Sequence, residues 1–257
     1  MIYYIIMFFI LGTILGSFYM VVAMRIPRGE SIVMPPSHCD KCNHRLTPIE
    51  LIPIFSYIIQ GGKCRSCKTK LSIFYPLYEF ICGVLFALTY ISYGLTPQLI
   101  IALTFVSMLL IIVLSDIEYM IISDGVLIVS LIFLIIEIFV IYDLKTLGIS
   151  LLNGLIAFAI MFLLRLFGNF IFKKDTMGGG DIKLMFIFGL VLDYKMAILS
   201  IFIGSIIGLP ISLILVKNKS NHEVPFGPFL SLGAIIILLF QLNLDKLLEV
   251  YKWNLLL

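Results

Sequence analysis

Residues 1–24, MIYYIIMFFILGTILGSFYMVVAM, carry no charged side chain and are long enough to cross a bilayer. The run has no basic start, and Arg25 follows it, so we expect a retained first span rather than a cleaved signal peptide. Similar runs recur along the 257 residues, of which 61% are hydrophobic and 13% charged. Soluble domains are about 45–50% apolar and about 25% charged. The sequence therefore predicts an all-α, polytopic membrane helix bundle.

The apolar runs predict about eight membrane-spanning helices. They are expected at residues 3–24, 72–93, 97–115, 122–142, 147–170, 182–192, 195–216 and 227–242. The segment DYK, residues 193–195, interrupts a run too long for one comfortable span. A single bent helix there is the alternative, and it would leave seven spans. Residues 243–257 are interpreted as an amphipathic helix in the membrane interface.

One long polar segment, residues 25–71, separates the first two spans. It holds eight of the 18 Lys and Arg residues, which places it in the cytoplasm by the positive-inside rule. By alternation, the loops at 116–121, 171–183 and 217–226 also face the cytoplasm. The basic residues lie in loops between spans, so we expect no nucleic-acid-binding surface.

Two aspartates reach the cytoplasmic edge under this topology. Asp116 ends the third span, and Asp181 opens the sixth, 65 positions later. A pair of close carboxyls can hydrolyse a peptide when one is ionised and activates water while the other is protonated and polarises the carbonyl. An Asp near a helix start is also often only a cap, and for Asp181 alone that alternative stays open.

Three glycines precede the second aspartate in MGGGDIK, residues 177–183. Gly178, Gly179 and Gly180 lack Cβ atoms, so they permit close approach of a substrate backbone or a neighbouring helix. Lys183 follows, and we expect it to hold one carboxylate ionised, with snorkelling to lipid headgroups as the alternative.

Four cysteines in the polar segment form two CxxC pairs, with 21 residues between the pairs. They are Cys39, Cys42, Cys64 and Cys67. Four thiolates at this spacing suit tetrahedral zinc in a small zinc-ribbon-like loop, and disulfides are disfavoured in the cytoplasm. Redox or disulfide pairs are the alternative. A segment with few large apolar side chains needs such a metal as a structural support.

The order of these motifs resembles the type IV prepilin peptidase family. GGGD followed by Lys matches its GxGD motif, and LSDIEYMIISD precedes it, with Ser123 where that family often has proline. Further matches are LGSFYMVVAMRIPRGES at 15–31, the two CxxC pairs, YPLYEFICG at 75–83 and VPFGPFLSLG at 224–233. The resemblance covers nearly the whole chain.

The resemblance implies an activity, a site and a location. Asp116 and Asp181 would be the catalytic pair of a membrane aspartic endopeptidase that cuts leaders from type IV prepilins or pseudopilins. Members with the cysteine loop also methylate the new N-terminus with S-adenosylmethionine. The expected location is a bacterial inner membrane, multi-pass, with the active site at the cytoplasmic face. Residues 1–71 would then form a methyltransferase-associated part and residues 72–257 the peptidase core.

Other charged residues near the cytoplasmic edge are candidate contacts. Glu79 is an acid within an apolar helix, and it could bind the substrate amine or the methyl donor, or simply pair with a nearby Arg or Lys. Arg25 and Arg28 could bind the substrate or the methyl donor, or they could anchor the protein to anionic membrane lipids. A peptidase without methylation, a transporter and a membrane scaffold with a zinc loop are the rival functions.

Overall fold

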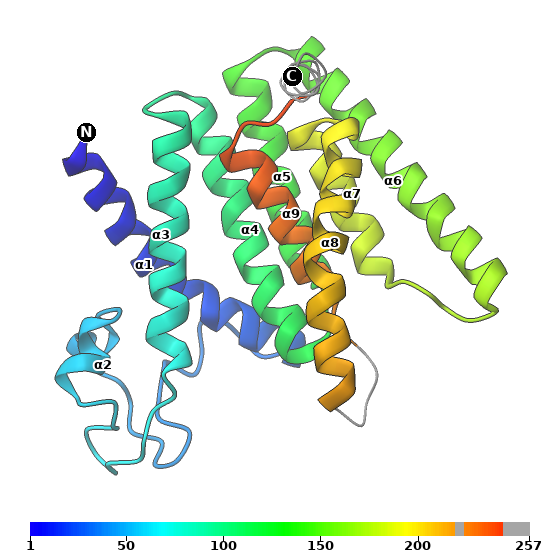
Figure 1. The fold of residues 1–257 in the computed structure, drawn as a ribbon. Coiled ribbons are helices and arrows are strands. Elements are labelled where there is room, and N and C mark those ends of the chain that lie inside the picture. Colours follow the sequence, from blue (N-terminus) through cyan, green and yellow to red (C-terminus); the bar gives the residue numbers. More distant parts are fainter. Residues whose placement is uncertain (219–223, 244–257) are drawn as a thin grey trace, which may run out of the picture. The chain divides into compact units, whose positions relative to one another are not determined.

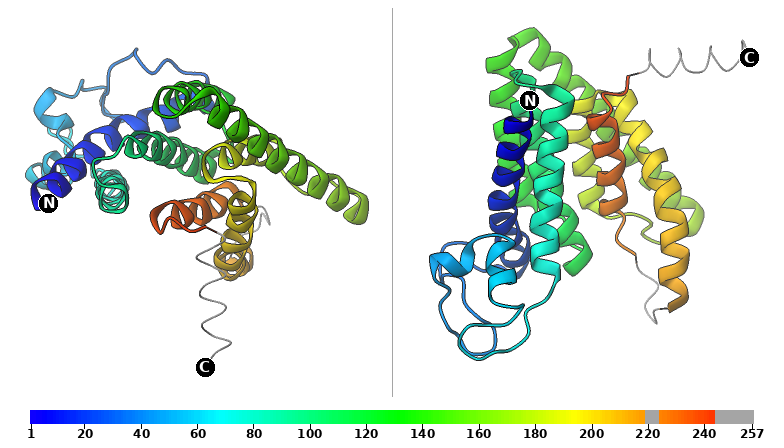
Figure 2. Two further views of the ribbon diagram at one scale, coloured as in Figure 1. Left: turned by 90° about the horizontal axis from the view of Figure 1, so that it is seen from above. Right: turned by 60° about the vertical axis from the view of Figure 1, so that its left-hand side comes forward.

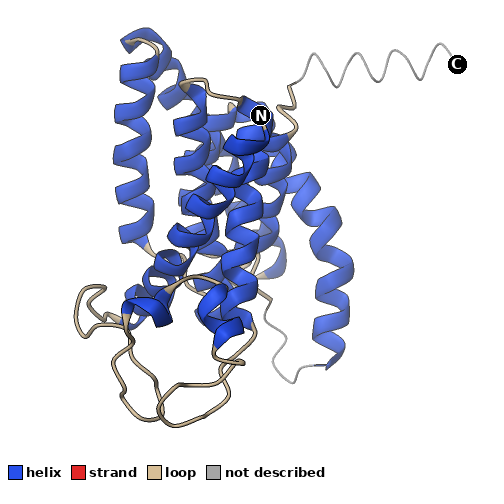
Figure 3. Ribbon diagram, turned by 90° about the vertical axis from the view of Figure 1, so that its left-hand side faces the viewer, coloured by secondary structure: helices blue, strands red, loops and turns tan. Residues whose placement is uncertain are grey.

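The computed structural model describes residues 1–218 and 224–243. Within these residues every regular secondary-structure element is a helix, as Figure 3 shows. The fold is the predicted helix bundle. The interfacial helix expected at 243–257 lies outside the described residues, apart from Asn243.

Within the described residues, eight helices of 13 or more residues occupy the predicted places, and the five-residue α2 (Phe55–Ile59) lies in the polar segment (Figure 1). The eight are α1 (Ile2–Arg25), α3 (Phe74–Tyr93), α4 (Gln98–Tyr119), α5 (Asp124–Ile141), α6 (Leu144–Phe172), α7 (Gly179–Leu192), α8 (Tyr194–Asn218) and α9 (Gly227–Leu239). The helix is interrupted between α7 and α8 at Asp193, whose φ is +74°. The Asp193 carboxylate accepts hydrogen bonds from the backbone N–H groups of Lys195 and Met196, at 2.7 and 3.0 Å, and so starts a new helix. The alternative of one bent helix was wrong.

Helix length separates two classes among the eight. Six described helices are long and apolar enough to cross a membrane, namely α1, α3, α4, α5, α6 and α8. The other two, α7 and α9, have 14 and 13 residues. Fourteen residues extend about 21 Å, less than the roughly 30 Å of the hydrocarbon layer. At one end, each of these two helices must therefore be surrounded by protein, because it is too short to reach both membrane surfaces.

The first compact unit spans Met1–Leu95. In it α1 packs along α3, and the helices meet at glycines: a Cβ on Gly12 would lie 2.6 Å from the carbonyl oxygen of Cys82. Such contacts between small residues drive helix association in membranes. Because α3 packs against α1, the compact unit ends at Leu95, whereas the sequence analysis placed a functional boundary at residue 71.

The second compact unit spans Thr96–Leu257 and is organised around α7. This short helix packs against α5, α6, α8 and α9, and α9 lies beside α8 (Figure 2). The ring of Phe188 on α7 meets that of Phe105 on α4 edge to face, with centroids 5.5 Å apart, and both side chains are fully buried. The unit thus buries most of α7 from Asp181 onward among other helices.

Candidate active site

Asp116 lies in the last turn of α4, directly before a tight turn of the chain. Met120 adopts the left-handed conformation, with φ +55°, and its N–H bonds the carbonyl of Asp116 at 2.9 Å. The hydroxyl of Ser115 donates to the carbonyl of Ile121 at 2.8 Å, which fixes the loop. Asp116 is only 6% exposed.

Asp181 lies in the first turn of α7, three residues after the N-cap Gly178. Its carboxylate accepts the backbone N–H of Gly178, so it also caps the helix. Gly180 packs directly on the α4–α5 loop: a Cβ there would lie 2.7 Å from Cβ of Ile122. Asp181 is 7% exposed. The cap alternative therefore describes one contact of this carboxylate, although its burial exceeds what a surface cap needs.

The structure brings the two aspartates together in one cavity of about 700 Å³. The walls are the α4–α5 loop, the glycine segment 176–181 and residues 224–226 before α9. Both carboxylates line this one cavity, so a charge on either would act on the other. The first turns of α7 and α9 both meet this cavity, and helix N-termini favour negative charge. A single ionised carboxylate is therefore stabilised here, whereas two would repel each other.

Lys183 has a different partner from the one expected. Its Nζ lies 2.7 and 2.9 Å from the two carboxylate oxygens of Asp124, the first residue of α5. Both side chains are exposed. The ammonium thus binds Asp124 and not Asp181, so the sequence expectation for Lys183 is not what the structure shows.

Gly227 contacts the site, and the sequence analysis assigned it no role. Its backbone N–H donates to the carboxylate of Asp116. The VPFGPFLSLG segment carried the signal, but it was used only as a family match, with a span expected from residue 227. Helix α9 does begin at Gly227, with Pro228 in its first turn.

We expect Gly227→Ala to reduce catalysis at this site by about 10²-fold, because misplacement of a reacting group by about 1 Å has such an effect. The new Cβ would lie 2.5 Å from Oδ2 of Asp116 and must displace that carboxylate. Gly148→Ala in α6 is the matched control, since Gly148 lies outside the cavity and its new Cβ would have no neighbouring atom within 4 Å. Rates of peptide cleavage by equal amounts of folded protein check this. Equal rates for the two variants would contradict the assigned role of Gly227.

The four cysteines form a second cluster, in the first unit. Their sulfur atoms all lie within 4.8 Å of one another. The Sγ atoms of Cys39 and Cys67 are 3.9 Å apart, as are those of Cys42 and Cys64. A tetrahedron with metal–sulfur bonds of about 2.3 Å has sulfur separations of about 3.8 Å. A disulfide needs about 2.05 Å. The cluster could therefore hold a tetrahedral metal ion.

The backbone builds this cluster from two similar turns. In each turn the first cysteine exchanges hydrogen bonds with the residues that follow, and a left-handed residue, Asn43 or Lys68, ends the turn. Hydrogen bonds from Thr69 lower the pKa of Cys67 to about 6. The backbone of His44 favours a Cys42 thiolate, but desolvation and the three neighbouring sulfurs outweigh it and raise its pKa to about 11. Four thiolates here need a cation.

The histidines beside the cluster have other partners. The His38 ring bonds the carbonyl of Pro36 at 2.9 Å, and the His44 ring lies 3.3 Å from the carboxylate of Glu50. Hydrogen bonds from the backbone and hydroxyl of Thr47 lower the pKa of Glu50. Neither histidine belongs to the four-cysteine cluster.

The remaining candidate residues lie in the first unit. Glu79 accepts the backbone N–H of Ile54 at 2.8 Å and bonds the hydroxyl of Ser17. It thereby ties the polar segment to α1 and α3, and these contacts differ from the Arg or Lys pairing considered above. Arg25 donates to the carbonyl of Ser31 at 3.0 Å, and Arg28 lies 4.0 Å from Glu30.

Two protein families match this chain. Residues 10–93 match the family described as the bacterial peptidase A24 N-terminal domain. Residues 103–213 match the type IV leader peptidase family. The first match contains the cysteine cluster and Glu79, and the second contains both buried aspartates.

Several curated relatives align over nearly the full length, and each is named prepilin leader peptidase/N-methyltransferase. The Bacillus subtilis (strain 168) protein is 35% identical over 95% of this chain and 96% of its own. The Neisseria gonorrhoeae protein is 30% identical over 95% of this chain and 92% of its own. The Pseudomonas aeruginosa protein is 28% identical, over 90% and 88%. No solved structure matches the chain significantly.

Proposed function

This chain belongs to the type IV leader peptidase family, and from that premise we propose that it removes the leader peptide from prepilin or pseudopilin precursors and methylates the new N-terminus. One observation carries the peptidase proposal: two aspartates from separate helices are buried in one cavity at the ends of α4 and α7. The six apolar helices and the bacterial relatives place the chain in an inner membrane as a multi-pass protein.

The geometry supports hydrolysis by the pair Asp116 and Asp181. One ionised carboxylate takes a proton from water, and the resulting hydroxide forms a bond to the carbonyl carbon of the scissile peptide. The other carboxyl, protonated, donates to the carbonyl oxygen. The tetrahedral intermediate collapses as its nitrogen gains a proton and the C–N bond breaks. The N–H groups of Gly227 and Gly178 orient the two carboxyls.

The pH profile of cleavage tests this mechanism. We expect a bell-shaped rate, because the pair works only when it carries one proton: acid protonates both carboxyls, and base ionises both. The measurement is the initial rate of leader removal from a precursor in detergent across the range in which the protein stays folded. A rate that rises steadily to high pH would contradict a carboxyl that must stay protonated.

A cytoplasmic active site is part of the proposal. The cavity is lined by the α4–α5 loop, by residues 176–181 at the start of α7 and by residues 224–226 before α9. In Figure 1 the α4–α5 and α6–α7 connections lie at the same end of the second unit. The positive-inside rule assigns the basic segment 25–71 to the cytoplasm, and alternation from it assigns the α4–α5, α6–α7 and α8–α9 connections to the same side. A precursor with a basic leader in the cytoplasm and an apolar helix in the bilayer would present its junction at this depth.

The cysteine cluster supports a structural zinc site in the same account. All four ligand positions of a tetrahedral ion are filled by Cys39, Cys42, Cys64 and Cys67, so the arrangement is that of a closed, structural site. Zinc would join the two turns and hold the polar segment folded.

The methylation proposal rests on the relatives' name and on the N-terminal family match. S-adenosylmethionine would supply the methyl group, and the amine freed by cleavage would accept it. Glu79 is engaged by Ile54 and Ser17, which favours a role in positioning the polar segment. Direct binding of the substrate amine or methyl donor by Glu79, Arg25 or Arg28 remains a prediction. A peptidase without methylation is the second candidate.

A further inference from the structure

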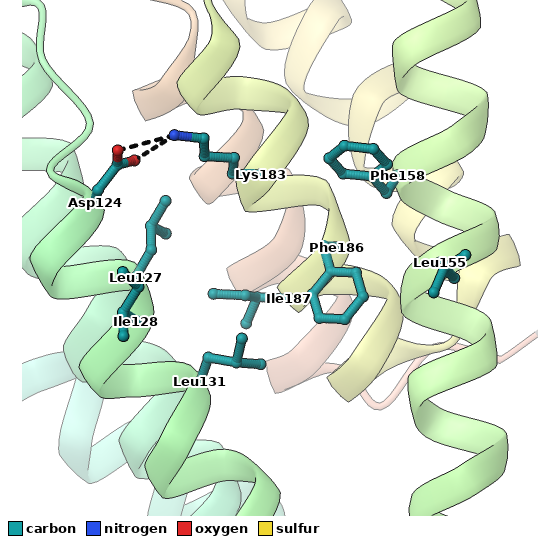
Figure 4. A pocket seen from close by; sticks show the side chains of 9 residues that line it. All are labelled: Asp124, Leu127, Ile128, Leu131, Leu155, Phe158, Lys183, Phe186 and Ile187. Atoms are coloured by element: carbon teal, nitrogen blue, oxygen red, sulfur yellow. Dashed lines mark hydrogen bonds and ion pairs between the residues drawn. The ribbon is translucent and has the colours of Figure 1, made fainter.

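A second hollow in the second unit is not part of the aspartate cavity. It is an apolar groove of about 590 Å³ between α5, α6 and α7 (Figure 4). Ile128 and Leu131 form one wall, Leu155 and Phe158 the other, and Phe186 lies on its floor. The groove opens because α6 packs closely on α7 and only sparsely on α5.

The single polar feature of this groove lies at its end nearest the predicted cytoplasmic edge. There Lys183 and Asp124 form their two-pronged ion pair. Each charge neutralises the other, so an apolar helix can pass the pair without burying a lone charge. Below it the described lining is entirely apolar. From Asp124 to Leu131 the wall on α5 extends about 10 Å along the helix axis.

The groove and the aspartate cavity are built from the same two chain segments. Ile122 and Asp181 line the cavity, whereas Asp124 and Lys183, two residues further along each segment, line the groove. Successive helical residues are about 100° apart, so Lys183 and Phe186 lie on the side of α7 away from Asp181. The first turn of α7 lies between the two hollows; it begins with Gly179 and Gly180, which have no side chains, and then bears Asp181.

We propose that this groove receives the apolar transmembrane helix of the substrate and that the scissile junction passes over the glycine turn of α7 to reach the aspartates. The proposal rests on the proposed function. Four extended residues span about 13 Å, more than the roughly 10 Å diameter of a helix. A junction unwound by four residues therefore reaches from the groove to the cavity, and unwinding also exposes the scissile carbonyl.

The test is photo-crosslinking in the full-length protein. A benzophenone amino acid replaces Ile128 in the groove or, as a control, Val129, which is at the same depth and similarly exposed but points about 100° away. Asp181→Asn in both proteins traps the uncut precursor. We expect several-fold more adduct with the precursor's apolar segment from position 128. Equal capture from both positions, or adducts of position 128 with lipid only, would overturn the proposal.

A rate measurement gives a second test. Ile128→Trp should fill the groove and slow cleavage of the membrane-inserted precursor by about tenfold or more, whereas Val129→Trp should stay within about twofold. A short peptide that spans the junction but lacks the helix should be cut equally by both variants. Equal precursor rates would overturn the groove while leaving the peptidase intact. No cleavage by the unaltered protein would instead refute the proposed function and the groove with it.

Discussion

Asp116→Asn and Asp181→Asn, each alone, are expected to lower the rate of leader cleavage by about 10³-fold or more, because each removes one of two groups that transfer protons in the reaction. Both side chains are buried in the same cavity, and Asn preserves their shape. The measurement is the rate of precursor cleavage by purified protein, with helix content followed by circular dichroism to confirm folding.

The exposed acid Asp124 supplies the control for this prediction. It lies outside the aspartate cavity and pairs with Lys183 on the surface of the second unit. Asp124→Asn should therefore leave the rate with a short junction peptide much closer to that of the unaltered protein. Full activity after substitution of either buried aspartate would favour the scaffold interpretation, in which the acids have no chemical role.

Loss of zinc is the second large effect we expect. The double substitution Cys39→Ser with Cys64→Ser removes one ligand from each turn, so metal content should fall from about one to about zero zinc per chain. The polar segment 25–71 should then become sensitive to protease. If the functional boundary lies near residue 71, methylation should be lost while cleavage continues. Mass spectrometry of the protein's metal content checks the loss of zinc, and the mass of the product checks cleavage and methylation.

Cys82→Ala is the matched control for zinc loss. Cys82 is fully buried in α3 and is not part of the cluster. The Cys82→Ala variant should therefore keep its zinc and still methylate the cleaved product. Zinc retained by the double variant, or lost from the Cys82 variant, would contradict the assigned ligand set.

The helices were predictable because their signal is strong and local. Long apolar runs with few or no charged residues are not compatible with water, so α1, α4 and α5 follow from composition alone, and the break at Asp193 follows from one polar tripeptide. The sequence defined the bounds of the short helices α7 and α9 less well. Their lengths depend on the helices that surround them, and a local sequence pattern does not show those contacts.

The site was predictable in part. Asp116 and Asp181 could be paired by depth, because topology places both at one edge of the membrane. The role of Gly227 was missed, since its contribution is a backbone N–H and a lack of volume beside Asp116. The partner of Lys183 was also missed. Asp181 is close to Lys183 in the sequence, whereas Asp124 is brought to it only by the packing of α5 on α7.

The most direct test of the central claim is the intact mass of a prepilin co-expressed with this protein, with Asp116→Asn and Asp181→Asn as controls. The account predicts a product that lacks its leader and is heavier by one methyl group, and the uncut precursor with either variant. A cleaved product without the methyl group would reduce the protein to a peptidase. A precursor left uncut by the folded, unaltered protein would contradict the account.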